Sequence, residues 1–108
     1  MTRCDPTAVA IDWLDAYRRG RIDEMVEMHS PDAVVDCTCE GGGAIQGKDS
    51  IAAYWQRRIG EDPSLDLLDI DSGGREVVIV YRTKSGIVEA LLDIAEDGLI
   101  TNCSCGRL

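Results

Sequence analysis

The sequence has no apolar run long enough to cross a membrane or to form the core of a secretory signal. Its first ten residues, MTRCDPTAVA, interrupt their few apolar side chains with charged and polar ones. No internal repeat, low-complexity tract or linker divides the 108 residues. We therefore expect one domain over residues 1–108, located in the cytoplasm and without a membrane partner.

Positive charge is also scarce. Eleven lysine and arginine residues stand against 20 aspartate and glutamate residues, which gives a net charge of −9. The densest basic segment is only Arg18-Arg19-Gly20-Arg21. A protein that binds nucleic acid neutralises phosphates with clustered lysine and arginine, so we expect no nucleic-acid partner.

Sequence motifs for phosphate and cofactor binding are missing. Neither GxGxxG nor GxxxxGK(S/T) occurs, so the three glycines at 41–43 predict a loop and not a phosphate cradle. The chain has a single histidine, His29. The sequence thus predicts no cofactor, and His29 is its one imidazole for metal binding or proton transfer.

Three segments carry helical signals. The first is predicted over residues 5–20, where Pro6 suits the first turn and Gly20 suits a left-handed C-terminal position. A shorter helix is predicted over 21–30, because apolar residues recur there at helical spacing. A third is predicted over 47–60, with two aromatic residues on its apolar stripe.

The other segments are typical of strands. In AVVDCTCE, alternation places Ala33, Val35, Cys37 and Cys39 on one face. Turns that contain glycine separate the four last runs, which predicts a meander of antiparallel strands. The predicted strands are 33–40, 44–46, 65–71, 76–84, 87–95 and 99–105. Helices and strands are partly segregated along the chain, which predicts an α+β domain.

Four of the five cysteines form two Cys-x-Cys pairs, Cys37 with Cys39 and Cys103 with Cys105. Four thiolates on neighbouring strands can hold Zn²⁺, but the usual structural zinc spacing is wider. We favour no metal, since free cysteines usually pack as small apolar side chains. A disulfide and a nucleophilic thiol with His29 as its base are the other interpretations.

Two segments, RRGRIDEMVEMHSPDAVVDC and AIQGKDSIAAYW, resemble the opening half of the nuclear-transport-factor-2-like superfamily, and the order of elements extends this resemblance over nearly the whole chain. The superfamily includes ketosteroid isomerase and polyketide-cyclase-like proteins. The resemblance implies a cone-shaped fold, in which a bent mixed sheet of five to six strands wraps on three helices. It also implies one internal apolar pocket and homodimers that form through the sheet.

The resemblance to the isomerase does not extend to its catalytic groups. The general base of the isomerase falls at Cys37, its oxyanion tyrosine at Trp13, and its protonated carboxylic acid near Ala90. Each departure removes the chemistry of the original residue. Cys37 and His29 are then the weak catalytic candidates that remain.

We expect a small-molecule-binding domain whose enclosed pocket takes a small apolar molecule. The alternatives are an enzyme of the isomerase, dehydratase or cyclase type, and a homodimeric interaction module with a vestigial pocket. The residues expected to line the pocket are Trp13, Tyr17, His29, Val35, Cys37, Cys39, Tyr54, Trp55, Ala90, Cys103 and Cys105.

Overall fold

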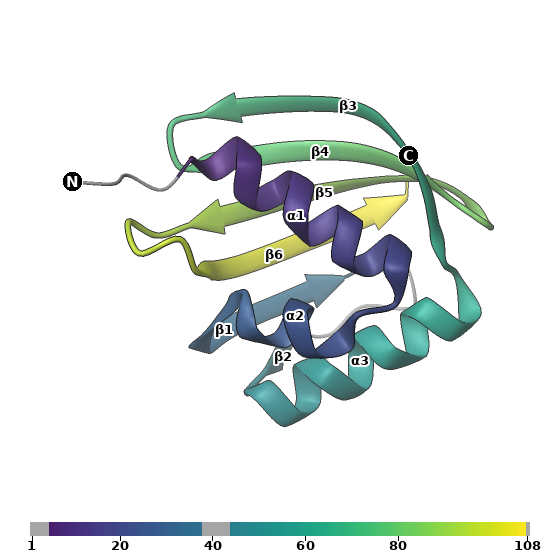
Figure 1. Cartoon of the computed structure of the whole chain (residues 1–108), viewed down its shortest axis with the longest axis horizontal. Coiled ribbons are helices and arrows are strands. Elements are labelled where there is room, and N and C mark those ends of the chain that lie inside the picture. Colours follow the sequence, from purple (N-terminus) through teal and green to yellow (C-terminus); the bar gives the residue numbers. More distant parts are fainter. Residues whose placement is uncertain (1–4, 38–43, 108) are drawn as a thin grey trace.

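A computed structural model describes residues 5–37 and 44–107 of the chain (Figure 1). Within these ranges, three helices and six strands follow one another along the chain. They are α1 (Pro6–Arg19), α2 (Ile22–Glu27), β1 (His29–Cys37), β2 (Ala44–Gln46), α3 (Lys48–Glu61), β3 (Ser64–Gly73), β4 (Glu76–Thr83), β5 (Gly86–Ile94) and β6 (Ile100–Arg107). The α+β class is confirmed.

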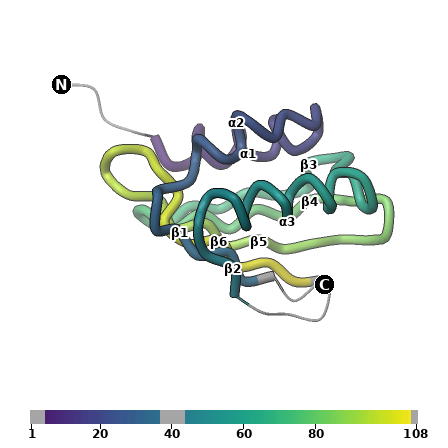
Figure 2. The backbone as a smooth tube through the Cα atoms, turned by 90° about the horizontal axis from the view of Figure 1, so that it is seen from below, coloured from purple at the N-terminus to yellow at the C-terminus, as the bar shows by residue number. Residues whose placement is uncertain are grey.

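The strands of the described residues form one bent sheet in the order β2-β1-β6-β5-β4-β3. Neighbouring strands are antiparallel except β1 and β6, which run parallel. The last strand therefore lies beside the first, and the sheet is mixed. All three helices cover one face of the sheet, and no helix or strand of the described chain covers the other face (Figure 2).

The first helix begins and ends where the sequence predicts. The side chain of Asp5 accepts a hydrogen bond of 3.1 Å from the backbone N–H of Thr7, which caps the N-terminus. Gly20 ends the helix in the left-handed region, with φ 71°, and its N–H bonds to carbonyls of the last turn. No helix of residues 5–37 and 44–107 has the length and apolar character needed to span a bilayer.

The second helix is shorter than predicted. It ends at Glu27, and His29 is the first residue of β1 and not the last apolar position of a helix. The reason is Pro31, whose ring disfavours a helical backbone at Ser30 and whose nitrogen cannot donate a helical hydrogen bond. The helical spacing of His29 is therefore a coincidence of sequence, and its side chain enters the core from a strand.

The helix-covered face of the sheet, here called the inner face, carries the core. Every second residue of β4 and β5 is buried, as strand alternation requires. On β4 these residues are Val77, Ile79, Tyr81 and Thr83, each at most 2 % exposed. Aromatic rings from α1 and α3 pack against them and fill the space between helices and sheet.

Candidate functional site

Five aromatic side chains lie together between the helices and the inner face, and we call them the aromatic cluster: Trp13, Tyr17, Tyr54, Trp55 and Tyr81. Their ring centroids lie 5.0–6.0 Å apart with steep interplanar angles, the edge-to-face geometry that aromatic pairs prefer. Each side chain is at most 5 % exposed. The four predicted pocket aromatics therefore do meet, and Tyr81 is a fifth member that the sequence analysis missed.

Three buried nitrogens of this interior have no hydrogen-bond partner among the described residues: Nε1 of Trp13, Nε1 of Trp55 and Nε2 of His29. A buried polar group without a partner costs about 1–3 kcal/mol, because it loses its bonds to water. Native structures satisfy most such groups, so each exception calls for an explanation. Within residues 5–37 and 44–107, two N–H donors and one further ring nitrogen therefore stand without a partner.

The orientation of His29 fixes its tautomer. Its Nδ1 lies 2.7 Å from the backbone oxygen of Met25, and a carbonyl only accepts, so Nδ1 carries the proton. The unpartnered Nε2 is then the basic nitrogen. Burial lowers the pKa of His29 below its usual 6.5, and the hydrogen bond to Met25 opposes this shift only in part. At neutral pH His29 is therefore an uncharged buried base.

An open groove between β2 and α3 leads to one edge of the aromatic cluster. It has a volume of about 400 Å³ and includes Tyr54, whose ring lies 5.0 Å from that of Trp55. The guanidinium of Arg57 sits 5.5 Å from the centre of the Tyr54 ring. The other lining residues are Ala44, Ile45, Gln46, Ser50 and Ala53. One member of the aromatic cluster, Tyr54, thus lines this groove.

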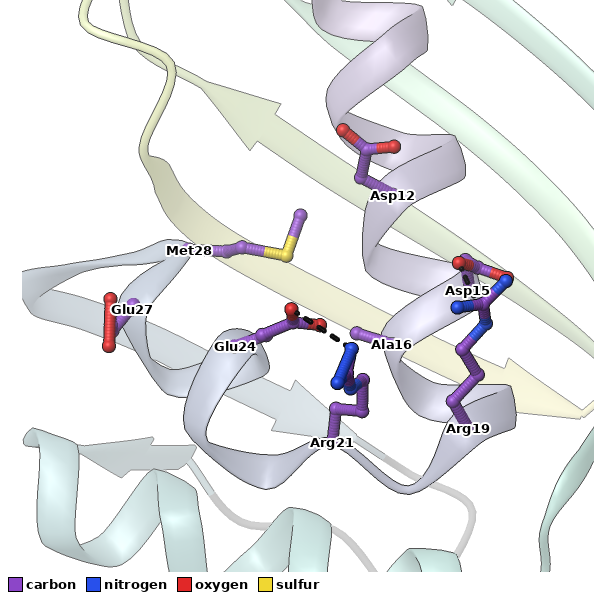
Figure 3. A pocket seen from close by; sticks show the side chains of 8 residues that line it. All are labelled: Asp12, Asp15, Ala16, Arg19, Arg21, Glu24, Glu27 and Met28. Carbon is purple, nitrogen blue, oxygen red and sulfur yellow. Dashed lines mark hydrogen bonds and ion pairs between the residues drawn. The ribbon is translucent and has the colours of Figure 1, made fainter.

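A second groove, between α1 and α2, is larger but differently lined (Figure 3). Its volume is about 440 Å³, and most of its lining is charged. The guanidinium of Arg19 pairs with Asp15 at 3.2 Å, and that of Arg21 pairs with Glu24 at 3.5 Å. These exposed pairs satisfy one another, and an apolar ligand would gain little there.

A buried polar network closes one end of the domain, and the sequence analysis did not find it. Arg58 of α3 pairs with Asp62 at 3.0 Å, with both side chains 5 % exposed. Asp62 also accepts bonds from the N–H and hydroxyl of Ser85 at 2.8 and 2.7 Å, and its backbone oxygen accepts from the Tyr17 hydroxyl. Burial raises the pKa of Asp62, but these bonds and Arg58 outweigh burial and hold the pKa below 3.8.

The predicted cysteine and small-residue positions lie on the inner face as far as they are described. Cys103 lies opposite Val35, and Cys105 lies opposite Cys37 on β1 and Ala90 on β5. Val35, Ala90 and Cys103 are 0 % exposed, and Cys105 is 6 % exposed.

Cys105 is disulfide-bonded, which the sequence analysis kept as an alternative, so it is neither the free apolar side chain that we favoured nor a thiolate ligand. Cys39 lies outside the described residues. Within residues 5–37 and 44–107, no three histidine, cysteine, aspartate or glutamate side chains group as metal ligands do.

The fold is that of the nuclear-transport-factor-2-like superfamily, as the resemblance implies. The family model of the SnoaL-like domain matches residues 10–101, and the chain belongs to this family. No curated protein matches the chain significantly.

Solved structures share the fold at low sequence identity. A SnoaL-like protein of unknown function from Burkholderia thailandensis superposes with a TM-score of 0.76 at 18 % identity, covering 89 % of this chain and 88 % of the other. SalBIII, an epoxide hydrolase/cyclase-like enzyme of pyran ring formation in salinomycin, gives 0.78 at 15 %, covering 94 % and 88 %. A candidate ketosteroid isomerase from Kribbella flavida gives 0.81 at 14 %, covering 94 % and 76 %. At these identities the likeness shows the fold alone.

Proposed function

We propose that the domain binds a small, largely apolar molecule between its helices and the inner face of the sheet. The observation that carries this proposal is the set of three unpartnered buried nitrogens, on Trp13, Trp55 and His29. Aromatic walls with a few polar groups are typical of sites for small molecules. The fold, which commonly serves small-ligand binding and isomerase or cyclase chemistry, agrees with this proposal.

The polar pattern of the interior specifies the ligand further. Both indole nitrogens only donate, so they suit a carbonyl or ether oxygen. The neutral His29 presents an acceptor nitrogen, which suits a hydroxyl group or an acidic C–H. A ring compound that carries one oxygen acceptor and one proton donor would satisfy all three nitrogens. We further propose that it enters along the groove between β2 and α3, past Tyr54.

Turnover of the ligand is a second candidate function, and His29 favours it. A buried, uncharged imidazole with a free Nε2 is a competent general base once a substrate proton lies within hydrogen-bond distance. The reaction class would be proton abstraction of the isomerase, dehydratase or cyclase type. Cys37 remains the weaker candidate, since its partner strand places the disulfide-bonded Cys105 directly opposite.

The close packing of the aromatic cluster favours the other candidate function, an interaction module with a vestigial pocket. Trp13, Tyr17, Trp55 and Tyr81 touch edge to face and leave a ligand little room unless a ring turns. An interaction module with a vestigial pocket would look the same. The enclosed pocket, the homodimer through the sheet and the cytoplasmic location stay predictions.

The test is binding of apolar ring ketones and ring alcohols, measured by the rise in melting temperature with ligand saturation. We expect at least one compound to stabilise the protein. Trp13→Phe, which removes one indole donor, should weaken its binding roughly 3- to 10-fold, the value of one hydrogen bond. The matched control is Ile94→Val, a small packing loss on the inner face outside the aromatic cluster, and it should leave affinity unchanged. No stabilisation across the panel, or equal losses in both variants, would overturn the proposal.

A further inference from the structure

One wall of the groove between β2 and α3 is a single stripe of the helix. Ser50, Ala53, Tyr54 and Arg57 recur at helical spacing and line the groove together, so they share the side of α3 that faces β2. The strand β2 (Ala44–Gln46) forms the other wall. The side chains of Ser50 and Ala53 are small and leave space between the walls. From Ser50 to Arg57 the groove follows about 10 Å of the helix.

Arg57 places a positive charge in this groove. Its guanidinium lies 5.5 Å from the centre of the Tyr54 ring, within the range of a cation–π contact. Its ion pair with Glu61 is long, at 3.8 Å, and both side chains are more than half exposed, so this pair contributes little. A planar guanidinium binds a carboxylate through two parallel hydrogen bonds, which an exposed pair at 3.8 Å does not provide. A carboxylate of a bound molecule can therefore compete with Glu61 for Arg57.

The described lining of this groove contains no carboxylate, although the chain has a net charge of −9. Three other grooves of the described surface each contain two or more carboxylates, from α1, α2 or β3. An anion bound in one of those grooves would meet like charges at short range. Beside Arg57 it would meet a cation first, and salt at physiological concentration screens charges that lie beyond about 8 Å. The groove between β2 and α3 is thus the better of these sites for an anion.

Tyr54 connects the groove to the interior of the domain. Its ring lines the groove and lies 5.0 Å from the ring of Trp55, whose Nε1 is one of the three unpartnered buried nitrogens. The outward step from the Tyr54 ring to the guanidinium of Arg57 has nearly the same length, 5.5 Å. A molecule whose ring lies near Trp55 therefore needs only a short arm to bring a second group to Arg57.

We propose that the ligand of the interior is a ring compound with an acidic arm. The arm lies in the groove between β2 and α3, its aliphatic part packs on Ile45 and Ala53, and its carboxylate accepts two hydrogen bonds from Arg57. This inference rests on the proposed function and adds to it the chemical class of the ligand. It also gives the exposed end of the groove a role in selecting acids over neutral ring compounds.

Three probes separate the contribution of the ring from that of the acid. They are a decalone that carries a butanoic acid arm, the methyl ester of this acid, and the decalone without an arm. Affinities follow from the rise in melting temperature with ligand concentration. We expect the acid to bind at least about fivefold more tightly than the ester, because only the acid gains charged hydrogen bonds. The exposure of Arg57 limits this gain.

Arg57→Gln tests the cation directly. It should remove the preference, so that acid and ester bind equally, and it should leave the affinity for the unsubstituted decalone unchanged within about twofold. The matched control is Arg18→Gln, which removes an exposed arginine of the groove between α1 and β3 and changes the net charge by the same amount. This control should keep the preference for the acid within about twofold of the unchanged protein.

Ala53→Leu tests the path of the arm. A leucine side chain on this stripe of α3 fills the groove and should weaken both the acid and the ester at least about tenfold. The matched control is Gln56→Leu, at an exposed position of α3 outside the lining, and it should weaken neither probe.

The outcomes distinguish this inference from the proposed function on which it rests. Equal binding of acid and ester to the unchanged protein would overturn the inference, as would a preference for the acid that persists in Arg57→Gln or disappears equally in Arg18→Gln. If the unsubstituted decalone still binds in these cases, the proposed function stands and the acidic arm alone is wrong. If none of the three probes binds, both are overturned.

Discussion

The two faces of the sheet differ sharply in the side chains that they carry. The inner face buries apolar side chains together with Cys103 and Cys105, and the aromatic cluster and the three unpartnered nitrogens lie between this face and the helices. The outer face, which is turned away from the helices, carries half-buried valines in the same rows as carboxylates. Leu91 and Leu92 are neighbours in β5, yet one belongs to each face. The comparison teaches that period-two alternation alone builds two surfaces of different chemistry from the same strands.

The largest loss of stability is expected from the buried ion pair of Arg58 and Asp62 at the C-terminal end of α3. Asp62→Ala leaves Arg58 buried without its counter-charge and should lower the free energy of unfolding by about 3–5 kcal/mol. Asp66→Ala breaks the exposed pair with Arg82 and should cost at most about 1 kcal/mol. Urea unfolding measures both. Equal losses of stability in the two variants would mean that the buried and the exposed ion pair do not differ in electrostatic environment.

The carboxylate of Asp62 should also make the protein less stable as the pH falls into the acid range. The folded pKa of Asp62 lies below 3.8, so its contribution is complete above that pH and is lost as the pH falls through the folded pKa. Asp62→Asn should therefore flatten the loss of stability in this acid range. An unchanged acid limb would show that other groups control acid unfolding.

The next effect compares adjacent residues of β5. Leu92→Ala opens a cavity at a fully buried position and should cost about 2–5 kcal/mol, whereas Leu91→Ala on the outer face should cost below about 1 kcal/mol. Thermal and urea unfolding give both values. A large loss at Leu91 would indicate that something covers the outer face, such as a second copy of the chain.

A smaller effect is expected from His29. Its folded pKa lies below 6.5, so its stabilising contribution is complete above that value and is lost as the pH falls through the folded pKa. The protein should therefore be less stable at about pH 5 than at about pH 7. His29→Asn keeps a donor for the Met25 oxygen and removes the basic nitrogen, so it should remove this pH dependence. If stability depended on pH equally in the wild-type protein and in His29→Asn, another group would be the one that titrates.

The smallest effect concerns the outer face alone. Glu76 and Asp93 face one another across β4 and β5, and like charges directly opposite destabilise a sheet. Glu76→Gln should raise the free energy of unfolding by about 0.5 kcal/mol at low ionic strength, and salt should abolish the gain. Asp12→Asn on α1 is the control and should give no comparable gain. A gain that persists in high salt would not be electrostatic.

Local signals predicted the elements well, because each depends on a few adjacent residues. Pro6 in the first turn of α1, the left-handed Gly20 and the turns between the last strands all occur as expected. The alternation of β1 also correctly placed Val35 on a buried face. The family resemblance supplied what alternation cannot, namely a bent mixed sheet that packs on three helices.

The parts of the site that sequence reasoning missed depend on contacts between distant residues. Ser85 bonds to Asp62 from 23 positions away, and nothing local indicates that pairing. Arg58 takes a buried place on α3 because Asp62 neutralises it, which helical spacing of apolar residues cannot show. The position of His29 was misread for the opposite reason, since its helical spacing outweighed the effect of Pro31 on the preceding backbone.

The central claim is that a ligand binds to the unpartnered nitrogens of Trp13, Trp55 and His29, between the helices and the inner face. The chain has two tryptophans, so its spectrum contains two indole N–H signals, from Trp13 and Trp55. The most direct measurement follows these signals while a ring ketone that raises the melting temperature is added. We predict a downfield shift of at least one indole proton and slower exchange with solvent, as a new hydrogen bond requires. A ligand that stabilises the protein while both indole signals stay unchanged would contradict the account.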